Sequence, residues 1–293
     1  MFNSKKKARK SKDGVKETVA LAQPGAFDLV ISMMSDVGCV RELNEDSGRY
    51  VQPDDPEMLQ RKGVLLVVAD GMGGHTAGEV ASSMAVEVVS KAYYGDSGDP
   101  RSAIEHAFHE ANRAIHTEAE KDASKNGMGT TCTALVLQNG TAISAHVGDS
   151  RLYLVRDGSI YLMTEDHSAV MEMVKAGLIT LEQARHHPEK NVILRAMGSH
   201  PEVEVTTWQE PFPVRAGDRF LLCSDGLYDL VQDDEIMRIV SLSVPQTACE
   251  NLIALAKERG GHDNITVGIV NLKPKGVDES NEVPETRTAE TLQ

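Results

Sequence analysis

The chain has 293 residues, of which 41% are apolar, and its formal net charge is −14 at pH 7. This length and apolar content suffice for a sizeable core, which we expect to form one large domain. The acidic balance argues against a nucleic-acid binder, and no apolar run reaches the roughly 18 residues of a membrane span. The cysteines are scattered without zinc-type spacing, which favours reduced thiols, and the basic start has no apolar segment behind it. We therefore expect a cytoplasmic protein.

Charge and composition divide the chain into three parts. Residues 1–24 carry six Lys or Arg before the first acidic residue, which predicts a disordered basic arm, with weak attraction to anionic lipid as the functional alternative. Residues 25–272 hold the periodic segments of the domain. Residues 273–293 are acidic and rich in Thr, Pro and Glu, which predicts a disordered tail.

The first half of the domain is organised around one apolar strand. A strand over residues 27–34 comes first, and Val64 to Ala69 then form a continuous apolar run that indicates a strand buried on both faces. Asp70 and Gly71 end this strand, and a capping box of Thr76 and Glu79 starts a helix over residues 76–94. Asp99 and Pro100 start a second helix with an apolar face.

The second half of the domain begins with two hairpins. Asn139-Gly140 joins strands over 130–138 and 141–147, and a further hairpin covers 152–163. Residues from about 166 to 199 carry only short helical pieces, at 169–176 and 181–186, which predicts a mobile flap over a site. The remaining elements are predicted as strands at 203–207, 218–224 and 265–272 and as helices at 234–241 and 245–259.

Acidic residues recur where the predicted strands begin or end. Four aspartates at these boundaries stand next to Gly or Asn: Asp70, Asp149, Asp225 and Asp263. Two further acids, Glu45 and Asp46, are predicted in a loop after the first strand. Oxygen ligands without a Cys or His cluster favour magnesium or manganese over zinc. Two such cations can clamp a phosphoryl group, and Arg41 could supply a bidentate phosphate contact.

These segments together resemble the bacterial branch of the PP2C (PPM) family of metal-dependent serine/threonine protein phosphatases. The resemblance covers roughly residues 28–272 in order and is carried by motifs at 41–46, 70–75, 148–151, 224–227 and 263–264. It implies an α+β fold, a central antiparallel β-sandwich flanked by pairs of α-helices. It also implies phosphorylated protein substrates, a cognate Ser/Thr kinase that the enzyme opposes, and two Mn²⁺ or Mg²⁺ ions, with a third in bacterial members. We expect a monomer.

The resemblance also implies a role for each motif residue. Asp70 would bridge both metals, the Gly71 carbonyl would bind one, and Asp225 and Asp263 would hold the second. Glu45 and Asp46 would act mainly through water, and Asp149 with Asp225 would form the third site. Arg41 would grip the substrate phosphate, and a metal-bridging hydroxide would attack phosphorus directly.

One departure from the family leaves the general acid open. Animal members have a histidine directly after the Asp-Gly pair, whereas this chain has Met72. His75 is the candidate here, with metal-bound water as the alternative donor. Two other functions are also compatible with the residues: a phosphohydrolase for small phosphate esters, and a catalytically dead phosphoprotein-binding module. The intact set of acidic residues and Arg41 argues against the second.

Overall fold

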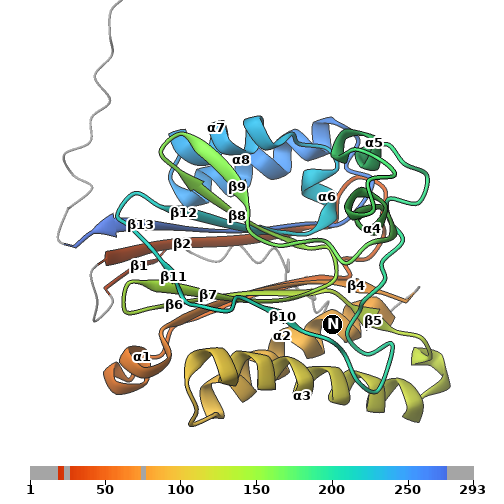
Figure 1. Cartoon of the computed structure of the whole chain (residues 1–293), viewed down its shortest axis with the longest axis horizontal. Helices are drawn as coiled ribbons and strands as arrows, with labels where there is room; N and C mark the ends of the chain where they lie inside the picture. Colours follow the sequence, from red (N-terminus) through yellow and green to blue (C-terminus); the bar gives the residue numbers. More distant parts are fainter. Residues whose placement is uncertain (1–18, 23–26, 74–76, 276–293) are drawn as a thin grey trace, which may run out of the picture.

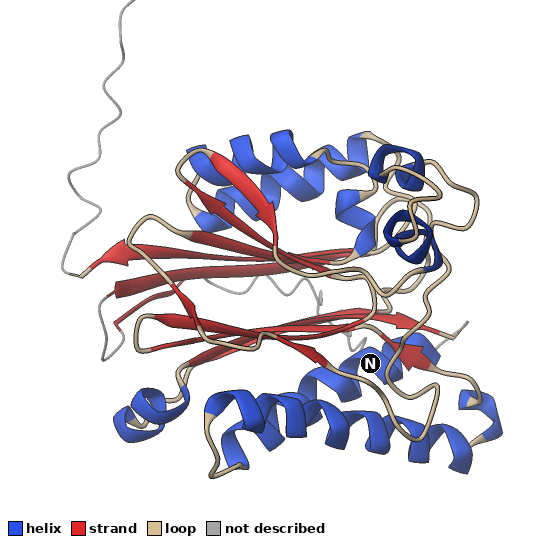
Figure 2. Cartoon of the chain, in the orientation of Figure 1, coloured by secondary structure: helices blue, strands red, loops and turns tan. Residues whose placement is uncertain are grey.

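Two antiparallel sheets lie face to face between two layers of helices (Figures 1 and 2). This is seen in a computed structural model of the chain, which describes residues 19–22, 27–73 and 77–275. The strand order is β1-β2-β13-β12-β8-β9 in one sheet and β10-β7-β6-β4-β3 in the other, where β11 also pairs with β7 and β5 with β4. The predicted α+β fold, a central antiparallel sandwich flanked by helices, is confirmed.

The strands are short to medium in length and pair partly as local hairpins and partly with distant segments of the chain. In the first sheet, they are β1 (Val19–Ala22), β2 (Phe27–Asp36), β8 (Arg151–Arg156), β9 (Ser159–Leu162), β12 (Arg219–Cys223) and β13 (Ile265–Pro274). In the second, they are β3 (Asp46–Val51), β4 (Val64–Met72), β5 (Gly129–Thr130), β6 (Cys132–Gln138), β7 (Thr141–Val147), β10 (Thr206–Thr207) and β11 (Phe212–Pro213). The most distant of these pairs is β2 with β13: the two strands are more than 200 residues apart in the chain and pair along their whole length.

The helices cover both outer faces of the sandwich. Those on or near the second sheet are α1 (Pro56–Lys62), α2 (Ala77–Gly95), α3 (Pro100–Lys121) and the 3-10 turn Ala123–Lys125. The others are α4 (Ala169–Lys175), α5 (Leu181–Arg185), α6 (Asp225–Tyr228), α7 (Asp233–Leu242) and α8 (Pro245–Glu258). In Figure 1, α4 and α5 stand at the same end of the sandwich as α6. No described helix has the length and apolar content of a membrane span.

The core consists of three apolar layers, one between the sheets and one under each helical layer. Strand β4 contributes to two of them, since Leu66 and Val68 face the other sheet while Leu65 and Val67 pack against α2 and α3. All six residues from Val64 to Ala69 are 0% exposed, which confirms the prediction of a strand buried on both faces. A strand held on both faces gives the residues at its end a rigid support.

Several local predictions are confirmed. The Asp99 carboxylate accepts the amide hydrogen bonds of Arg101 and Ser102 at the start of α3. Asn139 and Gly140 have φ values of +47° and +80°, as the predicted two-residue hairpin turn requires. The helical pieces of the flap segment are present as α4 and α5. All four cysteines are free thiols, three of them buried.

Other predictions are wrong in their bounds. Val19–Ala22, predicted within the basic arm of residues 1–24, pair with β2 as β1. Lys273 and Pro274, predicted within the tail that starts at residue 273, belong to β13. The strand predicted over 203–207 is reduced to β10, and β3, α1 and α6 were not predicted. The rest of the arm and tail and the capping residue Thr76 lie outside the described residues.

Candidate metal centre

Five chain segments bring their acidic residues to one end of the sandwich. Asp46 opens β3 and Asp70 lies near the end of β4, where the two are direct cross-strand partners. Asp149 follows β7, Asp225 follows β12 as the first residue of α6, and Asp263 precedes β13. The predicted strand-boundary positions hold for Asp70, Asp149, Asp225 and Asp263, whereas Asp46, predicted in a loop, is the first residue of β3. Because β3 is the edge strand of its sheet, its polar sequence lacks the apolar signal of a buried strand.

The Asp70-Gly71 segment is fixed by its own backbone. The Asp70 amide donates to Thr131 Oγ1 at 2.9 Å, and its carbonyl accepts from the Thr131 amide at 2.9 Å. The Gly71 amide donates to the Glu45 carbonyl at 3.1 Å. A Cβ on Gly71 would lie 2.1 Å from the Gly78 carbonyl oxygen and 2.5 Å from that of Glu45. Only glycine therefore allows β4, the Glu45 segment and α2 to approach this closely.

Asn264 holds the segment that carries Glu45. Its Oδ1 accepts the Glu45 amide at 2.8 Å, and its Nδ2 donates to the carbonyls of Val37 at 3.0 Å and Leu43 at 2.9 Å. Asn264 is 3% exposed. One buried amide side chain thus ties the residue 37–45 loop to the start of β13, next to Asp263.

The aspartates at this end share one electrostatic environment. Burial raises the pKa of Asp70 well above its ordinary value, and Asp46 and Asp225 raise it further. Burial also raises the pKa of Asp46 to about 6, although a hydrogen bond from Ser224 at 2.7 Å opposes this. The pKa of Asp149 is raised to about 7, first by burial and then by Asp166. A carboxylate cluster of this kind is stabilised by a bound cation.

Unpartnered carboxylate oxygens show that these residues fit a hard cation. Among the described residues, the buried side-chain oxygens without a hydrogen-bond partner include Glu45 Oε1, Asp46 Oδ1 and Asp225 Oδ1. A buried polar atom without a partner is costly, and carboxylate oxygens are the ligands of Mg²⁺ and Mn²⁺. We therefore conclude that the donor set suits such an ion.

The spacing of the acids indicates how such an ion would be held. Within residues 19–22, 27–73 and 77–275, no three Asp, Glu, His or Cys side chains already form a ligand group of their own. Such a wide arrangement of acids is still compatible with a bound Mg²⁺ ion, because Mg²⁺ is typically bound through one or two carboxylates and keeps several waters. Water molecules in the first coordination shell could therefore connect the ion to those carboxylates that lie too far away to bind it directly.

Arg41 lies on the rim of the acidic cluster. Its Nη2 donates to Asp263 Oδ2 at 2.9 Å, and its Nη1 lies 3.7 Å from Glu45 Oε2. Its side chain is 47% exposed. The structure thus brings Arg41 together with two of the predicted metal ligands and leaves it accessible from solvent. His75 lies outside the described residues.

The buried side chain of Arg151 lies near Asp149, and no role in the site was predicted for it. The Arg151 guanidinium forms an ion pair with Asp166 at 2.7 Å and lies 3.7 Å from the centre of the Tyr228 ring. The Tyr228 hydroxyl donates to the Asp149 carbonyl at 3.2 Å. Sequence reasoning missed these roles because the partners are 15 to 79 positions apart. The available signals were the position of Arg151 in the 148–151 motif and the polar run at 166–168.

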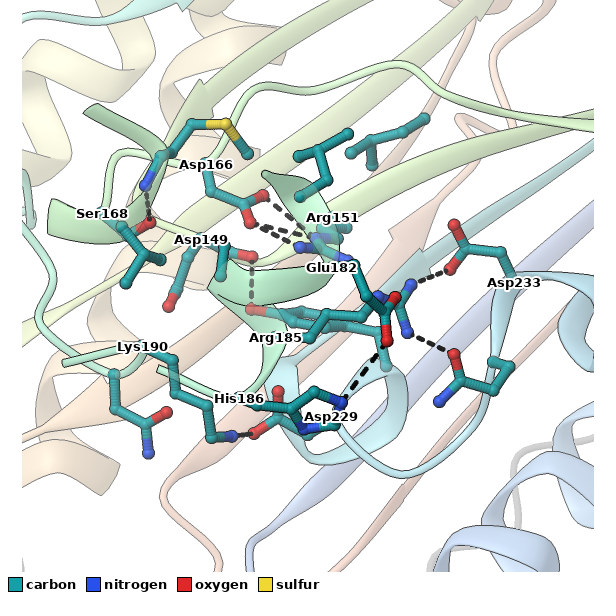
Figure 3. Close-up of a pocket in the computed structure, with 18 residues that line it drawn as sticks. Asp149, Arg151, Asp166, Ser168, Glu182, Arg185, His186, Lys190, Asp229 and Asp233 are labelled. Carbon is teal, nitrogen blue, oxygen red and sulfur yellow. Dashed lines mark hydrogen bonds and ion pairs between the residues drawn. The ribbon is translucent and has the colours of Figure 1, made fainter. Parts of the chain in front are cut away.

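A pocket of about 390 Å³ opens between the flap segment and α6–α7, with Asp149 in its lining (Figure 3). Three contacts join its opposite walls: Lys190 pairs with Asp229, and Arg185 pairs with Asp233 at 2.8 Å and donates to Gln232 Oε1 at 2.7 Å. Apolar side chains complete the lining, among them Leu162, Val170, Met171 and Leu181. The pocket therefore adjoins the acidic cluster at Asp149 and has both charged and apolar walls.

Comparison with known proteins gives a consistent result. Residues 49–257 match the family described as protein phosphatase 2C. The serine/threonine phosphatase Stp of Listeria innocua is 39% identical over 254 residues, which cover 84% of this chain and 98% of that protein. The crystal structure of the Mycobacterium tuberculosis serine/threonine phosphatase PstP matches with a TM-score of 0.75 and 39% identity, over 84% of this chain and 99% of that chain. A structure of the PstP catalytic domain in complex with two manganese ions matches with a TM-score of 0.72 and 38% identity, over 84% and 98%.

Proposed function

The chain belongs to the protein phosphatase 2C family, and we propose which of its residues perform the reaction. It is a metal-dependent serine/threonine protein phosphatase, a hydrolase that acts on phosphorylated proteins. The observation that supports the site assignment best is the group of unpartnered carboxylate oxygens on Glu45, Asp46 and Asp225 beside Asp70.

We assign the metal ligands to the acidic cluster. Asp70 would hold both of two metal ions, and the Gly71 carbonyl would bind one of them. Asp225 and Asp263 would hold the second ion. Glu45 and Asp46 would contribute mainly through water. Asp149 with Asp225 would form a third site, which the elevated pKa of both carboxyls supports. Because the related PstP catalytic domain binds two manganese ions, Mn²⁺ or Mg²⁺ is the expected metal.

The bound metal would supply Lewis-acid activation of water and would neutralise charge on the phosphoryl group. The chain's own residues would orient the substrate. The exposed guanidinium of Arg41, held in place by Asp263, would bind the phosphate oxygens in the bidentate manner typical of arginine. His75 stays our proposed proton donor to the leaving serine or threonine oxygen.

The pocket beneath the flap segment is the proposed place for substrate side chains next to the phosphorylated residue. It shares Asp149 with the acidic cluster and so would lie beside the reacting phosphate. Substrate choice would then depend on residues of α4, α5 and the 186–192 loop, which lie outside the motifs that hold the acidic cluster. This agrees with the sequence-based prediction of a flap over the site at about residues 166–199.

The proposed cellular setting follows from the activity and from the thiols. A serine/threonine phosphatase opposes a Ser/Thr kinase, which we propose as its functional partner. Four unpaired cysteines support a reducing compartment and hence a cytoplasmic location. We propose that the protein acts as a monomer.

A matched pair of variants tests the site assignment. Asp225→Asn removes a proposed ligand, whereas Asp157→Asn changes an exposed hairpin-turn residue whose positive φ of +52° asparagine tolerates. With Mn²⁺ and a phosphothreonine peptide, we expect Asp157→Asn to match the wild type and Asp225→Asn to lose about a hundredfold or more in kcat. Full activity of Asp225→Asn would refute the metal assignment. Faster turnover of a small phosphate ester than of the peptide would favour the small-molecule alternative.

A further inference from the structure

The turn that carries Asp149 is held by a histidine from the flap segment. His167 contacts Gly148 twice: the His167 amide donates to the Gly148 carbonyl at 2.7 Å, and the Gly148 amide donates to His167 Nδ1 at 3.1 Å. Both polar backbone groups of Gly148 therefore bond to one residue. His167 is 6% exposed, so these bonds are shielded from water.

The imidazole of His167 has one defined tautomer. Because Nδ1 accepts an amide hydrogen, the ring proton is on Nε2, and Nε2 lies 3.0 Å from Thr206 Oγ1, which can accept it. Burial lowers the pKa of His167 to about 3, which agrees with a neutral ring. The ring also packs 4.8 Å from that of His146, centre to centre.

Residue 148 has no room for a side chain. Its φ is +107°, and a Cβ there would lie 2.6 Å from Thr131 Cβ and Cγ2. Thr131 Oγ1 accepts the Asp70 amide and lies 2.7 Å from Ser150 Oγ. The turn thus lies between two residues. Thr131 accepts the hydrogen bond of the Asp70 amide, and His167 belongs to the flap segment.

The surroundings of His167 anchor it to both ends of the flap segment. Asp166 pairs with the buried Arg151, and Ser168 caps α4. The His167 carbonyl accepts the Leu194 amide at 2.8 Å. His167 is therefore fixed independently of Gly148, as a residue that positions another must be.

We propose that His167 is a positioning residue for Asp149, which acts by fixing the Gly148 backbone through its Nδ1 and its own amide. This inference rests on the proposed role of Asp149 in the metal centre. His167 forms its hydrogen bonds in the described part of the chain with Gly148, Thr206 and Leu194 and with none of the proposed metal ligands. Its effect is to hold the Asp149 carboxylate, and with it the third proposed metal site, at one place relative to Asp70 and Asp225.

The test compares three replacements at residue 167. In His167→Asn, Oδ1 can replace the Nδ1 acceptor, whereas His167→Gln places its acceptor near Nε2 and His167→Leu has none. His200→Leu, at an exposed histidine, is the matched control. The measurements are Mn²⁺ binding by calorimetry, kcat and KM with a phosphothreonine peptide, and melting in EDTA.

We expect His167→Leu to weaken the Asp149-dependent Mn²⁺ binding step and to lower kcat by about tenfold, while KM changes little because Arg41 is unaffected. His167→Asn should recover most of both losses, and His200→Leu should equal the wild type. If the leucine variant does not fold, the Asn and Gln pair makes the same comparison. Equal losses in the Asn and Gln variants, or in the Asn and Leu variants, would overturn the proposal.

A double variant separates this inference from the site assignment. If His167 acts through Asp149, adding His167→Leu to Asp149→Asn lowers kcat no further. Multiplied losses in the double variant would overturn the positioning role and leave the metal assignment intact. An Asp149→Asn variant with unchanged Mn²⁺ binding and kcat would instead overturn the assignment of Asp149, and the inference with it.

Discussion

Replacing Asn264 with alanine tests how the site-bearing loop is held. The change removes three hydrogen bonds, one from the Glu45 amide and two to the carbonyls of Val37 and Leu43. Each is worth about 1 kcal/mol, so the free energy of unfolding should fall by about 3 kcal/mol. The loss is not offset by water, because Asn264 is only 3% exposed.

Urea unfolding of the metal-free protein measures this loss without a contribution from ligand binding. With a slope of about 3 kcal/mol per M, the midpoint should shift down by about 1 M. Asn126→Ala, at an exposed asparagine, is the matched control and should stay within about 0.5 kcal/mol of the wild type. A loss below about 1 kcal/mol for Asn264→Ala would show that the residue 37–45 loop is held by other contacts and would refute this reasoning.

Three further changes have defined outcomes. Arg41→Ala should raise KM for a phosphothreonine peptide about tenfold with a smaller change in kcat, in steady-state assays, and Arg41→Lys should restore only part of the loss. Gly71→Ala should lower both the melting temperature and kcat, because its Cβ would meet the Gly78 carbonyl at 2.1 Å; an unchanged melting curve would contradict this. Burial lowers the pKa of His146 from 6.5 to about 4, so the unfolded chain takes up a proton first as the pH falls. His146→Gln should therefore remove roughly 3 kcal/mol of the stability loss between pH 6.5 and 4, measured by urea titration at each pH.

The parts of the fold that sequence reasoning predicted are those with a local signal. The apolar run of β4 and the Asn139-Gly140 turn each specify one conformation within a few residues. Strand β3 was missed because an edge strand next to a site carries polar residues, among them Asp46 itself. The short helix α6 was missed because its four residues are held by contacts with neighbouring segments instead of by periodicity.

The candidate site shows the same division. Asp70, Asp149, Asp225 and Asp263 were predicted because each stands beside Gly or Asn at a strand boundary, and Glu45 and Asp46 because they are adjacent acids in a short segment that also holds Arg41. The residues that hold them, Asn264, Arg151 and His167, were not assigned their roles. Their partners are distant in the chain, with Asn264 bonding to a residue 219 positions away, and no local pattern encodes such a pairing.

The most direct test of the central claim is phosphate release from a phosphothreonine peptide by the purified chain, measured with Mn²⁺, with Mg²⁺ and with excess EDTA. We expect release with either metal, its loss in EDTA, and its recovery when Mn²⁺ is added back in excess. Release that persists in EDTA, or no release from a folded sample under any metal, would contradict a metal-dependent protein phosphatase built on Asp70 and its neighbouring acids.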